Sequence, residues 1–320
     1  MKPIVILLVL LVCAFAFPLM AAAAGSLSLP PATMGILQEI YSGRFDVAIP
    51  QAQALQREQP QHPLGYLLET EARWWQVWCF AAEYKYGMTL PRHKDRQPSD
   101  QAYLELAAKA ESLATTSLAQ QETAEMHFYA GMAEAQMARM FSLRGENRAT
   151  ARVGVRAREH FLKALALDPS LVDADLGLGL YNYYVDTLST VARVLRFFMG
   201  IPGGSKEEGI RQLRRAMEHG QLTATPARFY LAMDLHNYDQ KYEQALQLIT
   251  PLVEEYPDNA IFLLARGDLY RKLGRKTQAI ADYRVAMEKT FGDAECRKKI
   301  AKLARESLAA QGAGQAAAGQ

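Results

Sequence analysis

The sequence has little excess charge and lacks the short motifs that mark common catalytic and metal sites. Its 36 basic and 34 acidic side chains leave a formal net charge of +2 (36 − 34), so no strong field selects nucleic acid or an anionic membrane. The six histidines form no H-E-x-x-H motif and have no C-x-x-C partner, and no G-x-S-x-G is present. We therefore predict a non-catalytic protein with no cofactor, no metal and no nucleic-acid partner.

Runs of β-branched residues are also few, whereas alanine is abundant. This composition favours helices over strands. Half of the 320 residues are apolar, so the chain has enough apolar surface to bury. We predict an all-α fold.

The most regular part of the chain is a tandem repeat of two 34-residue units, Pro226–Asn259 and Ala260–Asp293. The second unit carries Gly267, Tyr270, Gly274, Ala279, Tyr283 and Ala286. This spacing resembles the tetratricopeptide repeat (TPR), in which two helices bury their apolar faces against each other and against the next unit. The resemblance implies a right-handed TPR-like α-solenoid of antiparallel helix pairs. Gly267 and Ala279 are the small residues that let two helices approach, and Gly274 suits a turn with positive φ.

The TPR resemblance extends over most of residues 29–293, although the middle helix pairs are longer than 34 residues allow. We predict a repeat domain over residues 25–293 and a charged capping helix over 294–308. Residues 309–320, rich in Ala, Gly and Gln, are expected to form a disordered tail.

Two narrower resemblances concern the middle of the chain. Phe198, Gly200, Pro202 and Gly203, followed by Gly209 and Leu213, resemble a segment of a eukaryotic TPR family that includes the fungal inclusion-body clearance protein. The order of a Trp-rich helix, an inserted apolar helix and terminal repeats is similar to that of a group of exported bacterial TPR proteins. Neither resemblance implies an activity.

The N-terminus has the layout of a secretory signal peptide. A short basic start precedes an apolar core over Ile4–Phe17, and the alanine run 21–24 offers cleavage before Gly25. We predict a signal peptide over residues 1–24 and a periplasmic or otherwise exported protein. The alternative is an uncleaved segment that anchors the chain in the inner membrane, because Ile4–Ala24 would span about 31 Å as a helix.

Cysteine is scarce, with Cys13 in the leader and Cys79 and Cys296 in the folded part. Export would permit a disulfide between the last two. A linear solenoid would place them many repeats apart, so we expect two separate thiols.

The segment from His62 to Tyr86 is predicted to be one aromatic helix containing all three tryptophans, Trp74, Trp75 and Trp78. Aromatic residues at helical spacing favour core packing, and the alternative is an aromatic floor for a small molecule. Gly87–Asp100 is predicted to be a polar surface loop, to which we assign no function.

Residues 187–199 are predicted to form an inserted apolar helix, too short to span a membrane. We expect Leu188, Val191 and Leu195 to be buried, and the alternative is a face that docks a partner or a membrane surface. The following Ile201–Gly204 segment and the capping box that starts at Ser205 indicate a structural turn rather than a phosphate loop.

In TPR proteins the first helix of each unit lines a concave groove. The repeat offsets place seven residues there, namely Tyr181, Asn182, Tyr230, Asp234, Asn237, Asp268 and Arg271. Asparagine can hydrogen-bond an extended peptide backbone, and tyrosine offers apolar contact with a polar tip. The leading hypothesis is therefore a scaffold or adaptor that binds another protein or peptide in this groove. The alternatives are a small-molecule carrier that uses the Trp-rich helix, and an enzyme whose site is assembled from scattered residues.

Overall fold

The part of the chain that the structure describes is all-α, as the composition predicted, apart from one short β-hairpin that was not predicted. The computed structural model describes residues 27–188, 196 and 200–317, so the expected signal peptide (1–24) and most of the expected inserted helix (187–199) lie outside the described residues. None of the described helices is long and apolar enough to cross a membrane. The helices and strands in chain order are α1 (Thr33–Tyr41), α2 (Phe45–Glu58), α3 (Leu64–Ala81), β1 (Ala82–Lys85), β2 (Met88–Pro91), α4 (Pro98–Gln120), α5 (Ala124–Leu143), α6 (Asn147–Leu167), α7 (Ala174–Thr187), α9 (Lys206–His219), α10 (Ala224–Asn237), α11 (Tyr242–Glu255), α12 (Ala260–Lys272), α13 (Lys276–Glu288) and α14 (Ala294–Ala317).

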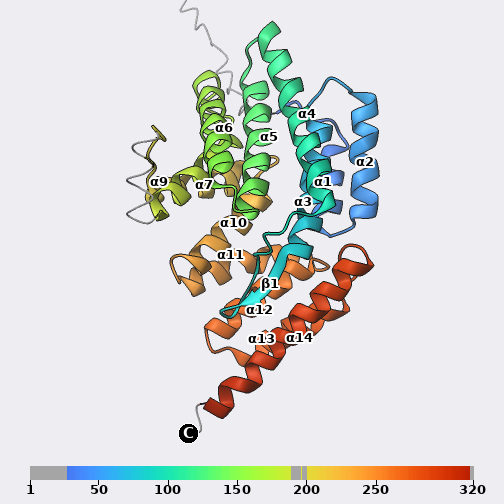
Figure 1. Ribbon diagram of the computed structural model, residues 1–320, viewed down its shortest axis with the longest axis vertical. Helices are drawn as coiled ribbons and strands as arrows, with labels where there is room; N and C mark the ends of the chain where they lie inside the picture. Colours follow the sequence, from blue (N-terminus) through green and yellow to red (C-terminus); the bar gives the residue numbers. More distant parts are fainter. Residues whose placement is uncertain (1–26, 189–195, 197–199, 318–320) are drawn as a thin grey trace, which may run out of the picture.

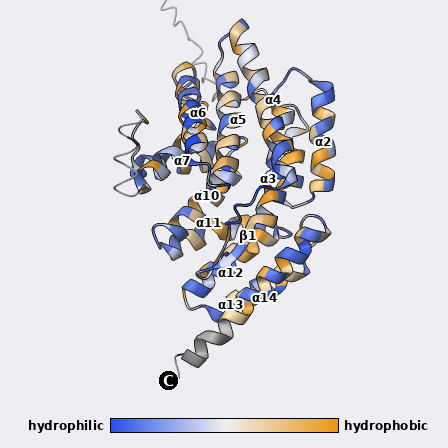
Figure 2. Ribbon diagram, viewed as in Figure 1, coloured by the Kyte–Doolittle hydropathy of each residue, from blue (hydrophilic) through white to orange (hydrophobic). Residues whose placement is uncertain are grey.

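Each helix packs against its neighbours in the sequence, so the helices form a continuous row from α1 to α14. Helices α4–α6 lie at one end of the molecule and α12–α14 at the other (Figure 1). Apolar and polar residues alternate along the described helices, as expected for helices with one buried face (Figure 2). The buried apolar side chains join into one core from Leu27 to Ala304. A continuous core of this kind couples each helix pair to the next.

The two C-terminal repeats have the helices that the spacing predicted, α10–α11 and α12–α13. A Cβ added at Gly267 would lie 2.6 Å from the ring of Tyr283, so glycine allows the close contact between α12 and α13. Gly274 has φ +72°, which a turn between these helices requires. The roles expected for both glycines are confirmed.

The β-hairpin replaces the end of the predicted aromatic helix and the start of the predicted loop. The helix ends at Ala81 rather than Tyr86, and β1 pairs antiparallel with β2 through Lys85 and Met88. Tyr86 (φ 56°) and Gly87 (φ +74°) form the two-residue turn between the strands. The interpretation of this segment as helix followed by loop was therefore wrong.

A disulfide joins Cys79 to Cys296, so the expectation of two separate thiols was also wrong. The Cα atoms are 5.6 Å apart, although 217 residues separate the two cysteines in the sequence. The cause is a long-range contact, because α14 packs against both α3 and β1. The helix row thus returns on itself and brings its first and last parts together.

Two further boundaries differ from the prediction. Helix α7 ends at Thr187, and Leu188 is extended and 37% exposed, so its predicted burial was wrong. Val191 and Leu195, the other two residues expected to be buried, lie outside the described residues. Helix α14 continues to Ala317, beyond residue 308, where the capping helix was predicted to end and a disordered tail to begin. This segment is rich in alanine, which has the highest helix propensity.

The three tryptophans of α3 belong to the core. Trp74, Trp75 and Trp78 are at most 3% exposed. The ring of Trp75 lies 5.2 Å from that of Phe229 on α10 and 5.6 Å from that of Phe262 on α12. Aromatic contacts therefore hold α3 against the two helices that carry most of the predicted groove residues.

Candidate binding site on α7, α10 and α12

The seven predicted groove residues lie on three helices, with two on α7, three on α10 and two on α12. On α10, Tyr230, Asp234 and Asn237 recur at i, i+4 and i+7, so they share one face of the helix. Their hydrogen bonds divide the seven into separate groups with different surroundings.

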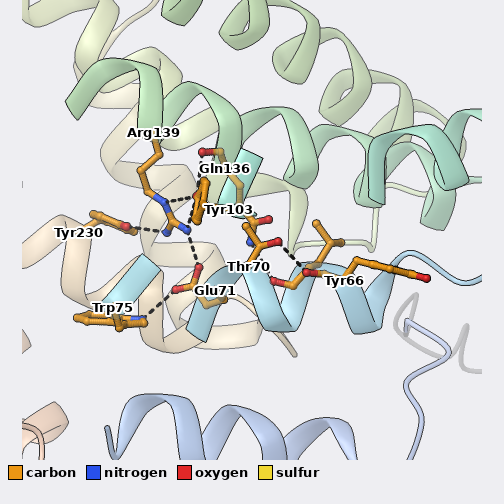
Figure 3. A network of polar contacts seen from close by, with 9 residues as sticks. Tyr66, Thr70, Glu71, Trp75, Tyr103, Gln136, Arg139 and Tyr230 are labelled. Atoms are coloured by element: carbon orange, nitrogen blue, oxygen red, sulfur yellow. Dashed lines mark hydrogen bonds and ion pairs between the residues drawn. The ribbon is translucent and has the colours of Figure 1, made fainter. Parts of the chain in front are cut away.

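Tyr230 belongs to a polar network centred on Arg139 of α5. Figure 3 shows the guanidinium of Arg139 between Tyr230 and Glu71, where it donates to the Tyr230 hydroxyl (3.1 Å) and to the Glu71 carboxylate (2.9 Å). It also donates to the Tyr103 hydroxyl (3.1 Å), and the Trp75 indole donates to Glu71 (3.0 Å). Burial raises the pKa of Tyr230, and the charge of Arg139 partly opposes this. The network fixes Tyr230, so its hydroxyl is already committed to Arg139.

Tyr181 and Asn182 hold the chain around the start of α9. The Tyr181 hydroxyl donates to the carbonyl of Pro202 (2.8 Å), and the Asn182 amide donates to the Gln212 side chain (2.8 Å). Both side chains of this pair therefore bind the chain's own residues.

Asp234 is a buried carboxyl with one oxygen in use. The hydroxyl of Tyr184 donates to Oδ1 (3.0 Å), whereas Oδ2 is buried and has no hydrogen-bond partner in the described part of the chain. The side chain is 2% exposed. Burial raises the pKa of Asp234 to about 8, and the nearby charge of Asp239 adds to this, although the bond from Tyr184 opposes it.

Asn237 and Tyr238 extend the same end of α10. The side-chain oxygen of Asn237 is buried and accepts no hydrogen bond within the described ranges. The ring of Tyr238 lies 6.0 Å from those of Tyr183 and Tyr184 and is 55% exposed. Tyr238 is therefore an exposed residue beside buried oxygens of Asp234, Asn237 and Asp239 that have no hydrogen-bond partner in the described part of the chain.

Asp268 and Arg271 hold the hairpin. The backbone N–H of Thr89 donates to Asp268 Oδ2 (2.6 Å), and the hydroxyl of Tyr283 donates to Oδ1 (2.8 Å). Arg271 donates to the carbonyl of Gly87 (2.7 Å). Burial raises the pKa of Asp268 to about 6, although the hydrogen bonds from Tyr283 and Thr89 lower it. Two predicted groove residues thus bind polypeptide backbone, and the backbone belongs to the chain itself.

The geometry of the hairpin explains why it offers backbone groups to α12. Lys85 and Met88 flank the two-residue turn and form a hydrogen-bonded pair, so the next pair, Tyr84 and Thr89, does not bond across the strands. The N–H of Thr89 therefore points away from β1, toward Asp268. Lys272 donates to the carbonyl of Tyr86 (3.1 Å) and adds a further contact at the turn.

Sequence reasoning missed Tyr184, Arg139 and the hairpin as parts of this region. Tyr184 follows Tyr181 by three residues on α7, so extending the repeat offsets by one helical turn would have found it. Arg139 lies on α5, whose helix pair exceeds the 34-residue spacing and gives no reliable offset.

Two further buried carboxyls are each paired with an arginine of their own. Glu134 and Asp175 also have a raised pKa, about 7 and about 6, because both are buried. Each has its own arginine, Arg156 for Glu134 and Arg215 for Asp175. The described residues contain no group of three or more His, Cys, Asp or Glu side chains that could hold a metal ion.

Two shallow hollows lie away from the tryptophans. One, of about 300 Å³, is lined by residues 240–244 and Leu273, and the other, of about 410 Å³, by residues of α6 with Gly200 and Ile201. Neither of these two hollows is lined by residues of α3, so neither is the pocket that the carrier hypothesis expects.

No protein-family model matches the chain, and no curated protein matches it.

Proposed function

We propose that the protein is an exported, non-catalytic scaffold that binds an extended segment of another protein along α7, α10 and α12. In this proposal the helices form a right-handed TPR-like solenoid of antiparallel pairs. The observation that carries the proposal is the contact between α12 and the hairpin, in which Asp268 and Arg271 bind backbone groups of Thr89 and Gly87. Residues chosen by groove offset alone therefore have the chemistry of backbone recognition.

The disulfide supports export. Disulfides persist in oxidising compartments such as the periplasm and are rare in the cytosol. The pair Cys79–Cys296 lies within the folded part of the chain, where Cys79 and Cys296 are at most 1% exposed. A buried disulfide of this kind fits a protein that folds after secretion.

Site-specific crosslinking tests the scaffold function. A photoreactive amino acid at Tyr238, the exposed border of the site, should crosslink to a defined partner in the cell envelope. The matched control places the same group at Val285, which is 40% exposed on α13. Adducts of the same size and yield from both positions, or none from Tyr238, would contradict the proposal.

N-terminal sequencing tests the export proposal separately. We expect the mature chain to begin near Gly25 and to be recovered in the soluble periplasmic fraction, because the alanine run ends the apolar core with small residues. Recovery of Met1 on a membrane-bound chain would instead show that the leader is an anchor.

A further inference from the structure

A row of three arginines lies on one face of α6. Arg148, Arg152 and Arg156 recur at i, i+4 and i+8, and all three are exposed. Within the described ranges, Arg148 and Arg152 make no ion pair, hydrogen bond or ring contact. The chain as a whole is nearly neutral, so this local concentration of positive charge needs its own explanation.

The row does not stabilise the helix that carries it. Like charges four residues apart repel each other, and Arg148 is the second residue of α6, next to the positive end of the helix dipole. The first turn of α6 contains no acidic residue that would offset this charge. Glu146 precedes the helix, but it accepts a hydrogen bond from Arg96 (2.7 Å). Residues that oppose local stability in this way are typical of functional sites.

The three arginines border the hollow of about 410 Å³. Between them, Ala151 and Val155 of α6 and Ile201 of the segment before α9 supply apolar surface. The volume lies in the range of small-molecule sites, which combine apolar walls with a few charged or polar groups. The hollow thus offers positive charge and apolar contact to the same small molecule.

A buried carboxyl holds Arg156 at the border of the hollow. The Nε of Arg156 donates to Oε1 of Glu134 on α5, and the Glu134 side chain is 1% exposed. No described residue accepts a hydrogen bond from the two Nη groups of Arg156. Because Glu134 offsets the charge of Arg156 when it is ionised, the unpaired charge at the hollow comes from Arg148 and Arg152.

We propose that this hollow binds a phosphate monoester that carries a small apolar group. A phosphate monoester has a charge of about −1.5 to −2 at pH 7, which matches the two unpaired guanidiniums of Arg148 and Arg152. Each planar guanidinium can donate two parallel hydrogen bonds to an oxyanion. The apolar group of the ligand contacts Val155 and Ile201.

This site goes beyond the proposed scaffold function, because α6 is not one of the helices α7, α10 and α12. The phosphate can belong to a soluble molecule or to a lipid headgroup, since both present the same oxyanion to the arginines. Calorimetry with a soluble ligand and sedimentation with vesicles separate these two sources.

Isothermal titration calorimetry with phenyl phosphate tests the inference on the purified, oxidised protein. We expect saturable binding of one molecule per chain, and tighter binding than that of inorganic phosphate, which lacks the apolar group. The double variant Arg148→Gln/Arg152→Gln should bind phenyl phosphate about tenfold or more weakly, because it loses the charged hydrogen bonds to the phosphate.

A matched double variant separates the site from general charge. Arg214→Gln/Arg284→Gln removes two exposed arginines on α9 and α13 that also lack a described partner. Its binding should stay within about twofold of wild type in about 0.1 M salt, where charges more than about 10 Å apart are largely screened. The thermal unfolding midpoint of Arg148→Gln/Arg152→Gln should be no lower than that of wild type, because the removed charges repel each other. Its weaker binding would then reflect a lost contact and not a lost fold.

Sedimentation with phosphatidylcholine vesicles that contain phosphatidic acid, a lipid with a phosphate-monoester headgroup, identifies the source of the phosphate. Binding of phenyl phosphate without binding to vesicles identifies a soluble ligand. Binding to the vesicles that Arg148→Gln/Arg152→Gln loses identifies a lipid headgroup, and both results support the inference. No binding to either probe, or equal binding by wild type and this variant, would overturn it. The scaffold function does not depend on these results, because crosslinking at Tyr238 tests it separately.

Discussion

At the scale of single residues, Asp234 is the most perturbed carboxyl whose shift bears on the site. Its folded-state pKa of about 8 lies above the ordinary value of 3.8, so the folded protein holds this proton more tightly than the unfolded chain does. The stabilisation that this proton gives to the folded state is complete below pH 3.8. It is lost as the pH rises toward the folded-state pKa of about 8. The free energy of unfolding should therefore fall over this range.

The variant Asp234→Asn tests this directly, because asparagine mimics the neutral acid and does not titrate. Between pH 5 and pH 8 the stability of the variant should rise relative to wild type by up to about 1.4 kcal/mol per pH unit. Chemical unfolding at several pH values measures the difference. Glu243, which is exposed, provides the control: the plot of stability against pH for Glu243→Gln should be parallel to that of wild type. A parallel plot for Asp234→Asn would contradict the prediction and show that Asp234 is ionised in the folded protein.

Ala279 tests the packing of the last repeat. It is fully buried on α13, close to the contact of Gly267 with Tyr283. Ala279→Leu should lower stability by about 1–3 kcal/mol, because the added methylenes have no space. Ala281→Leu is the matched control, since Ala281 is exposed on the same helix. Equal unfolding midpoints for the two variants would contradict the packing described for α12 and α13.

At the scale of secondary-structure elements, the hairpin depends on one backbone N–H. Thr89→Pro removes this donor and leaves Asp268 Oδ2 buried without a partner, which should cost about 1–3 kcal/mol. Hydrogen exchange of the backbone amides over residues 82–91 should also be faster in Thr89→Pro than in wild type. Thr89→Val keeps the N–H and removes only the hydroxyl, so it should lose much less stability than Thr89→Pro. Equal protection in both variants would mean that other contacts hold the hairpin.

The elements that were predictable from the sequence are those whose signal is local. Helices α10 to α13 follow the repeat spacing, and Gly274 marks a turn by its own conformational preference. The hairpin has no comparable signal, since Ala82, Glu83 and Lys85 are poor strand formers. Its contacts lie far away in the sequence, as the bond from Thr89 to Asp268 spans 179 residues.

The hydrogen-bond partners of the candidate site residues could not be predicted from the sequence. Repeat offsets placed Asp234 and Asp268 34 residues apart, and in the structure each carboxyl accepts a hydrogen bond from a tyrosine hydroxyl. The offsets could not reveal that the chain's own hairpin occupies Asp268 and Arg271. That depends on the return of α3 toward α12 and α14, which no local pattern encodes.

At the scale of the whole molecule, the Cys79–Cys296 disulfide joins parts separated by 217 residues. In the chain-entropy model, a loop of this length contributes about 5 kcal/mol by restricting the unfolded state. Adding reductant should therefore lower the stability of the wild-type protein by several kcal/mol. The double variant Cys79→Ala/Cys296→Ala should start lower and show no response to reductant. A wild-type protein whose unfolding curve is unchanged after complete reduction would contradict this.

The same disulfide determines how the protein bears a mechanical load. When the chain is pulled by its two ends, tension passes from Cys79 to Cys296 through the covalent bond. It bypasses every helix and strand from β1 to α13. The oxidised molecule can lengthen only by unravelling α1 to α3 and α14, so helices α10 and α12 remain unloaded. In an optical trap, reduction should add the contour length of more than two hundred residues in later steps. In the proposed scaffold, helices α10 and α12 would therefore keep their arrangement while the two ends of the chain are under tension.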